Sequence, residues 1–232
     1  MLARISQIVS LLFLSMAFLA SAQADPITLY TTGVANNGSL LAAGAVDSHY
    51  QYISGGSAQN LYVSGPNPPT WAGNTGSSQW ISLDPNGNRD HPNGSYTFRT
   101  TFTIDPAAGF DLATATITGT LYTDDRVRIF LNGRDTGINL PPTPGSGYLP
   151  AALSSFLIST GFVLGTNTLD FVIANTPAAA TPIGLQVVTL SGNINRPGTA
   201  PIPEPTTLVL LGTGLAAVAT GIRRQRKRRA ND

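Results

Sequence analysis

Cysteine is absent from the 232-residue chain, so structural disulfides, thiol catalysis, thiolate metal sites and a lipid anchor on an N-terminal cysteine are excluded. Histidine occurs only at His49 and His91, and the single glutamate is Glu204. Glycoside hydrolysis needs two carboxylates that flank the scissile bond. Aspartates would have to supply both, and no Gly-x-Ser-x-Gly, His-Glu-x-x-His or phosphate-loop motif occurs. The sequence therefore predicts a protein that is not an enzyme, with His49 as a packed or turn-bonding residue.

Lysine is nearly absent as well, because the only one is Lys227 near the C-terminus. The formal charge of the whole chain is +1, but between Asp25 and Pro205 six arginines stand against eleven acidic residues, a net charge of −5. An acidic, lysine-free body is poorly suited to phosphate backbones, so no nucleic-acid partner is expected.

An uncharged stretch and a basic cluster end the chain. Residues 206–222 would form a helix of roughly 25 Å, somewhat short of the roughly 30 Å hydrocarbon layer, and flanking arginines can snorkel to shorten the mismatch. The sequence predicts a transmembrane helix over 206–222 and a cytoplasmic tail over 223–232. A basic cluster can also bind nucleic acid or anionic lipid, but its place after an apolar segment favours the topological role. The basic residues of the tail are Arg223, Arg224, Arg226, Lys227, Arg228 and Arg229.

The N-terminus has the pattern of a cleaved secretory signal over residues 1–24. Arg4 gives a positive start, an apolar stretch follows, and Ala22 and Ala24 form an A-x-A cleavage site before Asp25. An uncleaved anchor helix is the alternative, but serines dilute the apolar stretch. The pattern predicts a signal helix handled by Sec-type export machinery and signal peptidase.

Pro203-Glu204-Pro205, followed by the apolar stretch and the basic tail, resembles a PEP-CTERM protein-sorting domain. The segment 198–205 would be a linker that ends in this motif. The resemblance implies recognition by an exosortase in the inner membrane and cleavage near the motif. It also implies delivery to the outer surface or the extracellular matrix.

The exported body, expected over residues 25–197, has the patterns of an all-β protein. Residues 96–104 alternate, with Tyr96, Phe98 and Phe102 on one face, which predicts a half-buried strand. Asn132-Gly133 is a preferred pair for a type I′ hairpin turn, so another strand should start near Asp135 or Gly137. The other predicted strands are 113–122, 126–131, 155–158, 168–174 and 185–190. Short strands separated by Gly, Pro and Asn predict an antiparallel β-sandwich, specifically a jelly roll.

Two segments of the body, 124–133 and 161–173, resemble the strand pair of galactose-binding-like jelly rolls. Such domains occur as carbohydrate-binding modules, so the resemblance implies a body that binds extracellular polysaccharide. A purely structural surface protein without a ligand is the alternative, and a small glycan-acting enzyme is the least favoured.

Trp71, Asp124 and Asp125 are the candidate ligand-binding residues. Trp71 lies in a Pro/Gly/Asn-rich stretch and is expected to be an exposed platform for sugar stacking, whereas Trp80 beside Ile81 is expected in the core. Asp124 and Asp125 could bind sugar hydroxyls or a cation. A polar turn that bonds its own backbone is the common alternative for such a pair.

One loop has oxygen-bearing side chains at alternate positions, as calcium ligands prefer. The loop lacks the glycine at the sixth position and the acid at the twelfth that a calcium-binding loop requires. A plain Asx-type turn is therefore the default, and no cofactor is expected, with calcium as the weak alternative. The candidate calcium ligands are Asp84, Asn86, Asn88 and Asp90.

Overall fold

The computed structural model describes residues 24–141, 146–176 and 180–197. One compact unit runs from Gln23 to Pro197 and contains all of the described residues. The predicted signal segment, the linker with its Pro-Glu-Pro motif, the transmembrane helix and the basic tail lie outside the described residues, except for Ala24. Within the described ranges, no helix is both long and apolar enough to cross a membrane.

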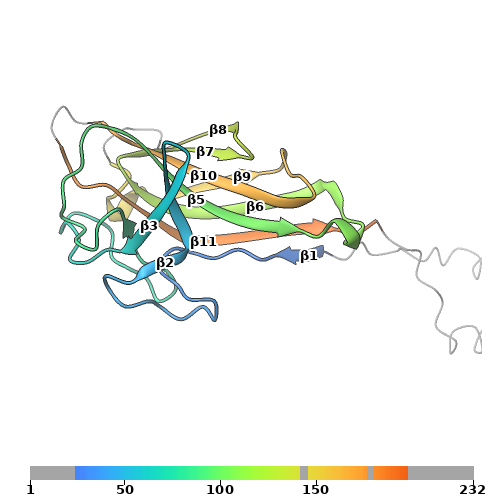
Figure 1. The fold of residues 1–232 in the computed structure, drawn as a ribbon, viewed down its shortest axis with the longest axis horizontal. Coiled ribbons are helices and arrows are strands. Elements are labelled where there is room, and N and C mark those ends of the chain that lie inside the picture. Colours follow the sequence, from blue (N-terminus) through green and yellow to red (C-terminus); the bar gives the residue numbers. More distant parts are fainter. Residues whose placement is uncertain (1–23, 142–145, 177–179, 198–232) are drawn as a thin grey trace, which may run out of the picture. The chain divides into compact units, whose positions relative to one another are not determined.

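The described part of the body contains eleven strands and two short 3₁₀ helices, and Figure 1 shows their arrangement. All strand pairs are antiparallel, and the hydrogen-bonded order is β8-β7-β10-β5-β2-β3-β4-β11-β6-β9, with β1 paired to β11. The strands are β1 (Ala24–Ile27), β2 (Val46–Ser54), β3 (Ser57–Val63), β4 (Ile81–Ser82), β5 (Gly94–Ile104), β6 (Asp111–Asp124), β7 (Arg126–Leu131), β8 (Arg134–Leu140), β9 (Ser154–Ile158), β10 (Gly165–Asn175) and β11 (Gly184–Asn195). The 3₁₀ helices are η1 (Pro106–Ala108) and η2 (Pro150–Ala152).

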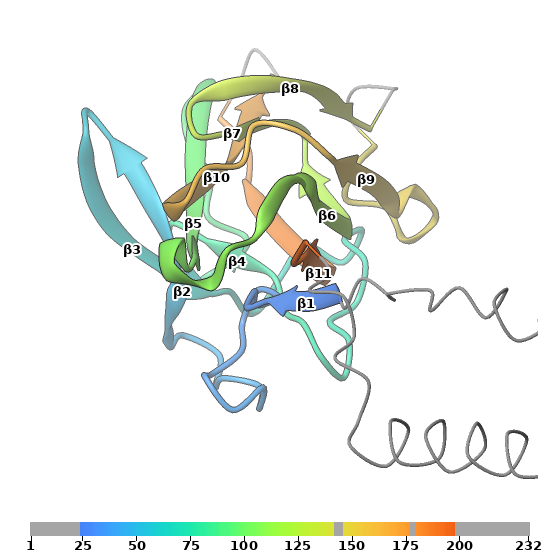
Figure 2. The same ribbon diagram turned by 90° about the vertical axis from the view of Figure 1, so that its right-hand side faces the viewer.

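The sheet folds into two halves around one core, and the short strand β4 joins them. The first half holds β8, β7, β10, β5, β2 and β3, and the second holds β4, β11, β6 and β9 with β1 at its side. From β5 onward the chain passes back and forth between the halves, apart from the β7–β8 hairpin, which is the connectivity of a jelly roll. Viewed end-on, the strands surround a common interior (Figure 2). The predicted all-β antiparallel sandwich is confirmed.

Side chains alternate between the two faces of each strand, and those that face inward fill the interior. In β5 the buried residues are Phe98, Thr100, Phe102 and Ile104, as the pattern of residues 96–104 predicts. Burying large apolar side chains is the main favourable contribution to folding, at about 1.5–3 kcal/mol each. The core also takes in Tyr50, Leu61, Ile117, Leu121, Val127, Ile129, Leu169, Phe171, Ile173, Leu185 and Val187.

The turn between β7 and β8 confirms the prediction made from Asn132-Gly133. Both residues have positive φ, 53° at Asn132 and 74° at Gly133, as a type I′ turn requires, and β8 begins at Arg134. The Asn132 side chain adds a second role, because its Nδ2 donates to Gly161 O at 2.9 Å and its Oδ1 accepts from Thr168 N at 2.9 Å. The turn is therefore tied to β10 and to the loop before it.

A second, smaller core lies outside the sandwich, where the loop 64–80 covers the start of β11. Its buried members are Trp71, Ala72 and Trp80, and Tyr122 and Tyr148 pack against them. The first four residues of β11 are therefore buried on both faces of the strand. This covered corner contains all three candidate ligand-binding residues.

Candidate functional site

The two tryptophans pack together in the small core. Their ring centroids are 4.2 Å apart, and Trp80 Nε1 donates to Ala72 O at 2.7 Å. Trp80 is 0% exposed, so its predicted place in the core is confirmed. Trp71 is only 6% exposed, so the expectation of an exposed stacking platform is wrong.

Gly184 explains why Trp71 is buried. A Cβ atom at this position would lie 2.5 Å from Cη2 of Trp71, so only glycine lets the indole pack this closely on β11. Gly184 and Trp71 are distant in the sequence, and a Pro/Gly/Asn-rich stretch gives no sign of such a partner. Composition alone therefore places Trp71 on the surface.

The structure brings Trp71, Asp124 and Asp125 together. Trp71 Nε1 donates to Asp124 Oδ2 at 2.8 Å, while Asp125 Oδ2 accepts from the backbone N and the Oγ1 of Thr176, both at 3.0 Å. The peptide bond between the two aspartates is cis. Both residues are buried, at 6% and 5% exposure, so these oxygen atoms bond within the protein. Thr176 belongs to no motif, so the sequence gives no sign of its contact with Asp125.

Burial and the neighbouring carboxylate change the acidity of Asp124. Desolvation, together with the hydrogen bond and the charge of Asp125, raises the pKa of Asp124 to about 8, although the Trp71 hydrogen bond opposes the shift. Burial and the two carboxylates also raise the pKa of Tyr148, which is half-buried at the edge of this cluster. At neutral pH the Asp124 side chain is therefore a neutral acid within the small core.

In the candidate calcium loop, side-chain oxygen atoms accept hydrogen bonds from the backbone of the loop itself. Asp84 Oδ1 accepts from Asn86 N at 2.9 Å, and Asn86 Oδ1 accepts from Asn88 N at 3.1 Å. Arg89 Nε lies 3.4 Å from Asp84 Oδ2. These are the contacts of consecutive Asx turns. Among the residues that the structure describes, no group of three or more His, Cys, Asp or Glu side chains could hold a metal ion.

Removal of calcium is expected to leave the protein's stability unchanged, because Oδ1 of Asp84 and Oδ1 of Asn86 already accept backbone hydrogen bonds within the loop. Melting the purified protein in EDTA and in millimolar CaCl₂ should give the same midpoint. The variant Asp84→Asn should behave identically in the two buffers. A calcium-dependent rise in the midpoint that this variant abolishes would contradict the expectation.

His49 is packed, as expected. Its ring stacks on Tyr30 with centroids 3.6 Å apart, and its backbone N donates to Asp47 Oδ1 at 2.8 Å. Asp47 also accepts from Gly33 N at 2.7 Å, which ties the loop before β2 to that strand. Burial lowers the pKa of His49 and raises that of Asp47. This arrangement gives the histidine a structural role.

Comparison with known proteins identifies the C-terminal segment. Residues 201–227 match the family described as the PEP-CTERM protein-sorting motif. This range contains Pro203-Glu204-Pro205, the uncharged stretch and the first part of the basic tail, so the predicted resemblance is confirmed.

No curated protein matches the chain. A solved structure to which the chain is similar is CBM35 from Paenibacillus barcinonensis. The two are 15% identical with a TM-score of 0.33, and the match covers 61% of this chain and 94% of that chain. At these values the likeness carries no argument about the body. The chain carries a PEP-CTERM protein-sorting motif at residues 201–227 and is thereby identified as an exported protein.

Proposed function

We propose that this protein is a non-catalytic component of the outer surface or extracellular matrix, and that its β-sandwich contacts extracellular polysaccharide there. The observation that carries the proposal is the sorting motif at 201–227, which follows within a few residues of a compact body that ends at Pro197. The inner membrane would hold the precursor only transiently, through the apolar segment 206–222, until an exosortase cleaves near Pro203-Glu204-Pro205.

The arrangement of carboxylates supports a non-catalytic role. Hydrolysis of a glycoside requires two carboxyl groups far enough apart to flank the bond. Asp124 and Asp125 are neighbours in the chain, and their oxygen atoms bond to Trp71 and Thr176 in the small core. A sugar could not enter between them without displacing these contacts.

The hydrogen bonds of Asp124 and Asp125 within the small core also favour a second candidate function, that of a structural surface protein with no ligand. If the polar groups of the small core serve only its packing, then delivery and stability are the whole function of the body. The two candidates differ in one measurable property, which is saturable binding to a glycan.

Intact mass and glycan binding test the proposal together. Protein recovered from the outside of the host cell should have lost the residues after the Pro203-Glu204-Pro205 motif. Alanine replacement of the three motif residues should leave an uncleaved, membrane-associated precursor. The exported form should also bind exopolysaccharide from the host saturably and release no reducing sugar. An exported form that keeps its basic tail would contradict processing, whereas turnover of any glycoside would overturn the non-catalytic role.

A further inference from the structure

The outer face of the first half-sheet carries two rows of side chains that run across six strands. Residues that are directly opposite in antiparallel strands share a face, so the rows follow from the register. At about 4.8 Å between strands, each row is about 24 Å long. We call these two rows, together with Arg126, the outer strip. The first row is Asp135, Phe130, Asp170, Arg99, Gln51 and Asn60, and the second is Asn139, Arg128, Val172, Thr97, Ile53 and Ala58.

Three of the body's six arginines lie on the outer strip. Arg99 makes two hydrogen bonds to Asp170, from Nε at 2.6 Å and from Nη2 at 2.7 Å, which fixes its guanidinium against the sheet. Arg128 pairs with Asp135 and lies over the Phe130 ring, with Cζ 5.4 Å from the centroid. Among the described residues, the other N–H groups of these two guanidinium groups make no side-chain hydrogen bond that would keep them from a ligand.

Arg126 extends the second row on the same face of β7, opposite Ala174 of β10. Its Nε is buried and has no hydrogen-bond partner among the described residues, and no ion pair of Arg126 occurs there either. Arg126 is half-buried, so the exposed part of its guanidinium, which no carboxylate of the described residues pairs, could bond an anionic ligand.

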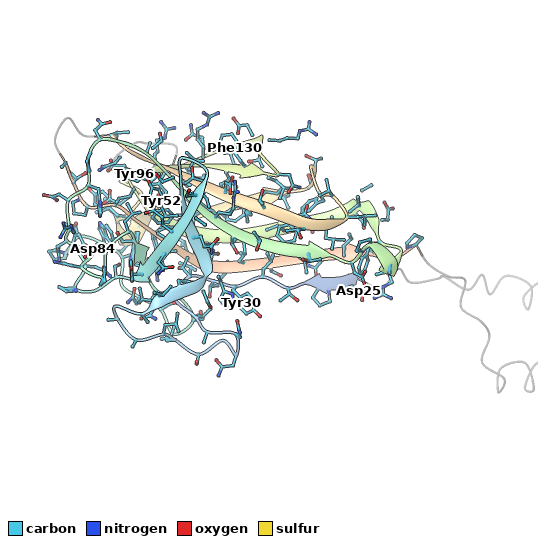
Figure 3. All side chains as sticks on the ribbon, in the orientation of Figure 1. Asp25, Tyr30, Tyr52, Asp84, Tyr96 and Phe130 are labelled. Carbon is cyan, nitrogen blue, oxygen red and sulfur yellow. The ribbon has the colours of Figure 1, made fainter. Side chains whose placement is uncertain are left out.

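The outer strip is positive, whereas the body is negative. Its three arginines face two aspartates, a net charge of +1, against −5 for the segment from Asp25 to Pro205. Charges more than about 8 Å away are largely screened at physiological ionic strength, so a ligand on this face responds mainly to the local arginines. Phe130 adds a flat apolar surface at the outer margin of the sandwich (Figure 3).

We propose that the outer strip binds an acidic polysaccharide, one whose sugar units carry carboxylate groups. Arg126 and Arg128 would bond the carboxylates, the Phe130 ring would pack against a sugar face, and Gln51 would bond hydroxyl groups. Arg99, which Asp170 holds in place, would supply one further N–H donor to the ligand. This inference rests on the proposed polysaccharide contact and names its site and its ligand class. A nucleic acid fits less well, because only three arginines stand against the high phosphate density of that polymer.

Affinity electrophoresis of the exported protein, in gels that contain polygalacturonate, dextran or duplex DNA, tests this site. Only polygalacturonate should retard the wild type, and 0.3 M NaCl should weaken the retardation. The double variant Arg126→Gln/Arg128→Gln should lose about tenfold or more in affinity, and Phe130→Ala about fivefold. The matched control Arg89→Gln/Arg196→Gln removes the same charge elsewhere and should bind like the wild type. Melting curves verify that each variant is folded.

The outcomes separate the outer strip from the broader proposal. Equal loss in both double variants, or retardation by dextran or DNA as strong as by polygalacturonate, would overturn the acidic-polysaccharide site. Undiminished binding of polygalacturonate by Arg126→Gln/Arg128→Gln would overturn the site and leave polysaccharide contact standing. If neither polygalacturonate nor the host's own exopolysaccharide binds, both the site and the polysaccharide part of the proposed function fail.

Discussion

Replacing Trp71 by alanine is expected to lower the free energy of unfolding by about 3–5 kcal/mol, the range for large aromatic side chains lost from a core. The indole packs against Trp80, with ring centroids 4.2 Å apart, and fits over Gly184. Its loss would leave a cavity in the small core and remove the donor to Asp124. Urea denaturation followed by tryptophan fluorescence and by far-UV circular dichroism measures the change.

A second substitution at this position separates packing from hydrogen bonding. Trp71→Phe keeps an aromatic ring but removes the N–H donor, so a smaller loss of about 1–3 kcal/mol is expected, part of it from the smaller ring. Leu157→Ala serves as the control, because Leu157 is 59% exposed and its truncation should change the stability by less than about 0.5 kcal/mol. A cost below about 1 kcal/mol for Trp71→Ala would show that the small core contributes little to the stability of the protein.

As the pH rises toward 8 the wild-type protein should lose stability, and Asp124→Asn should abolish most of this loss. The pKa of Asp124 is raised from 3.8 to about 8 in the folded protein. Between these values the folded state holds a proton that the unfolded state has released, so the stability falls as the pH rises and levels off above about pH 8. A shift of about four pKa units corresponds to at most about 6 kcal/mol over that window. Asparagine keeps the shape and can still accept from Trp71, without ionising.

Unfolding free energies measured from pH 6.5 to 9 test this expectation. Burial also raises the pKa of Asp47, and this carboxyl group is unchanged in the variant, so it contributes equally to both proteins. Burial lowers the pKa values of both histidines, so protonating them costs stability at acid pH, below this range. The exposed Asp111→Asn is the control and should keep the wild-type slope. Identical slopes in the wild type and in Asp124→Asn would refute the assignment of the alkaline loss to this carboxyl group.

The strands could be predicted because their signals are local. Alternation over 96–104 and the Asn132-Gly133 pair each report a backbone conformation that neighbouring residues determine. The sorting motif is local as well, since its triplet, apolar stretch and basic tail are contiguous. These features needed no knowledge of which strands pair.

The small core and the outer strip depend on which strands pair and in which register, and the sequence alone does not reveal that pairing. Trp71 is buried because Gly184 lies beneath it, more than a hundred positions away in the chain. The outer strip exists because Gln51, Arg99, Asp170 and Phe130 fall opposite one another in four strands, and a one-residue slip in any of them would turn its side chains inward. Long-range register therefore decides both the small core and the proposed binding face.

The first and last strands of the body are neighbours, and this determines how the body bears a load. Ala24 lies opposite Asn195, and Arg196 pairs with Asp25 through Nε at 3.0 Å. In this antiparallel pair both chain ends leave from the same end, so tension between them would open the ladder one bond at a time, as a zipper opens, rather than shear all its bonds together. The β1–β11 pair would therefore be the first element to yield if both ends of the body were held and pulled apart.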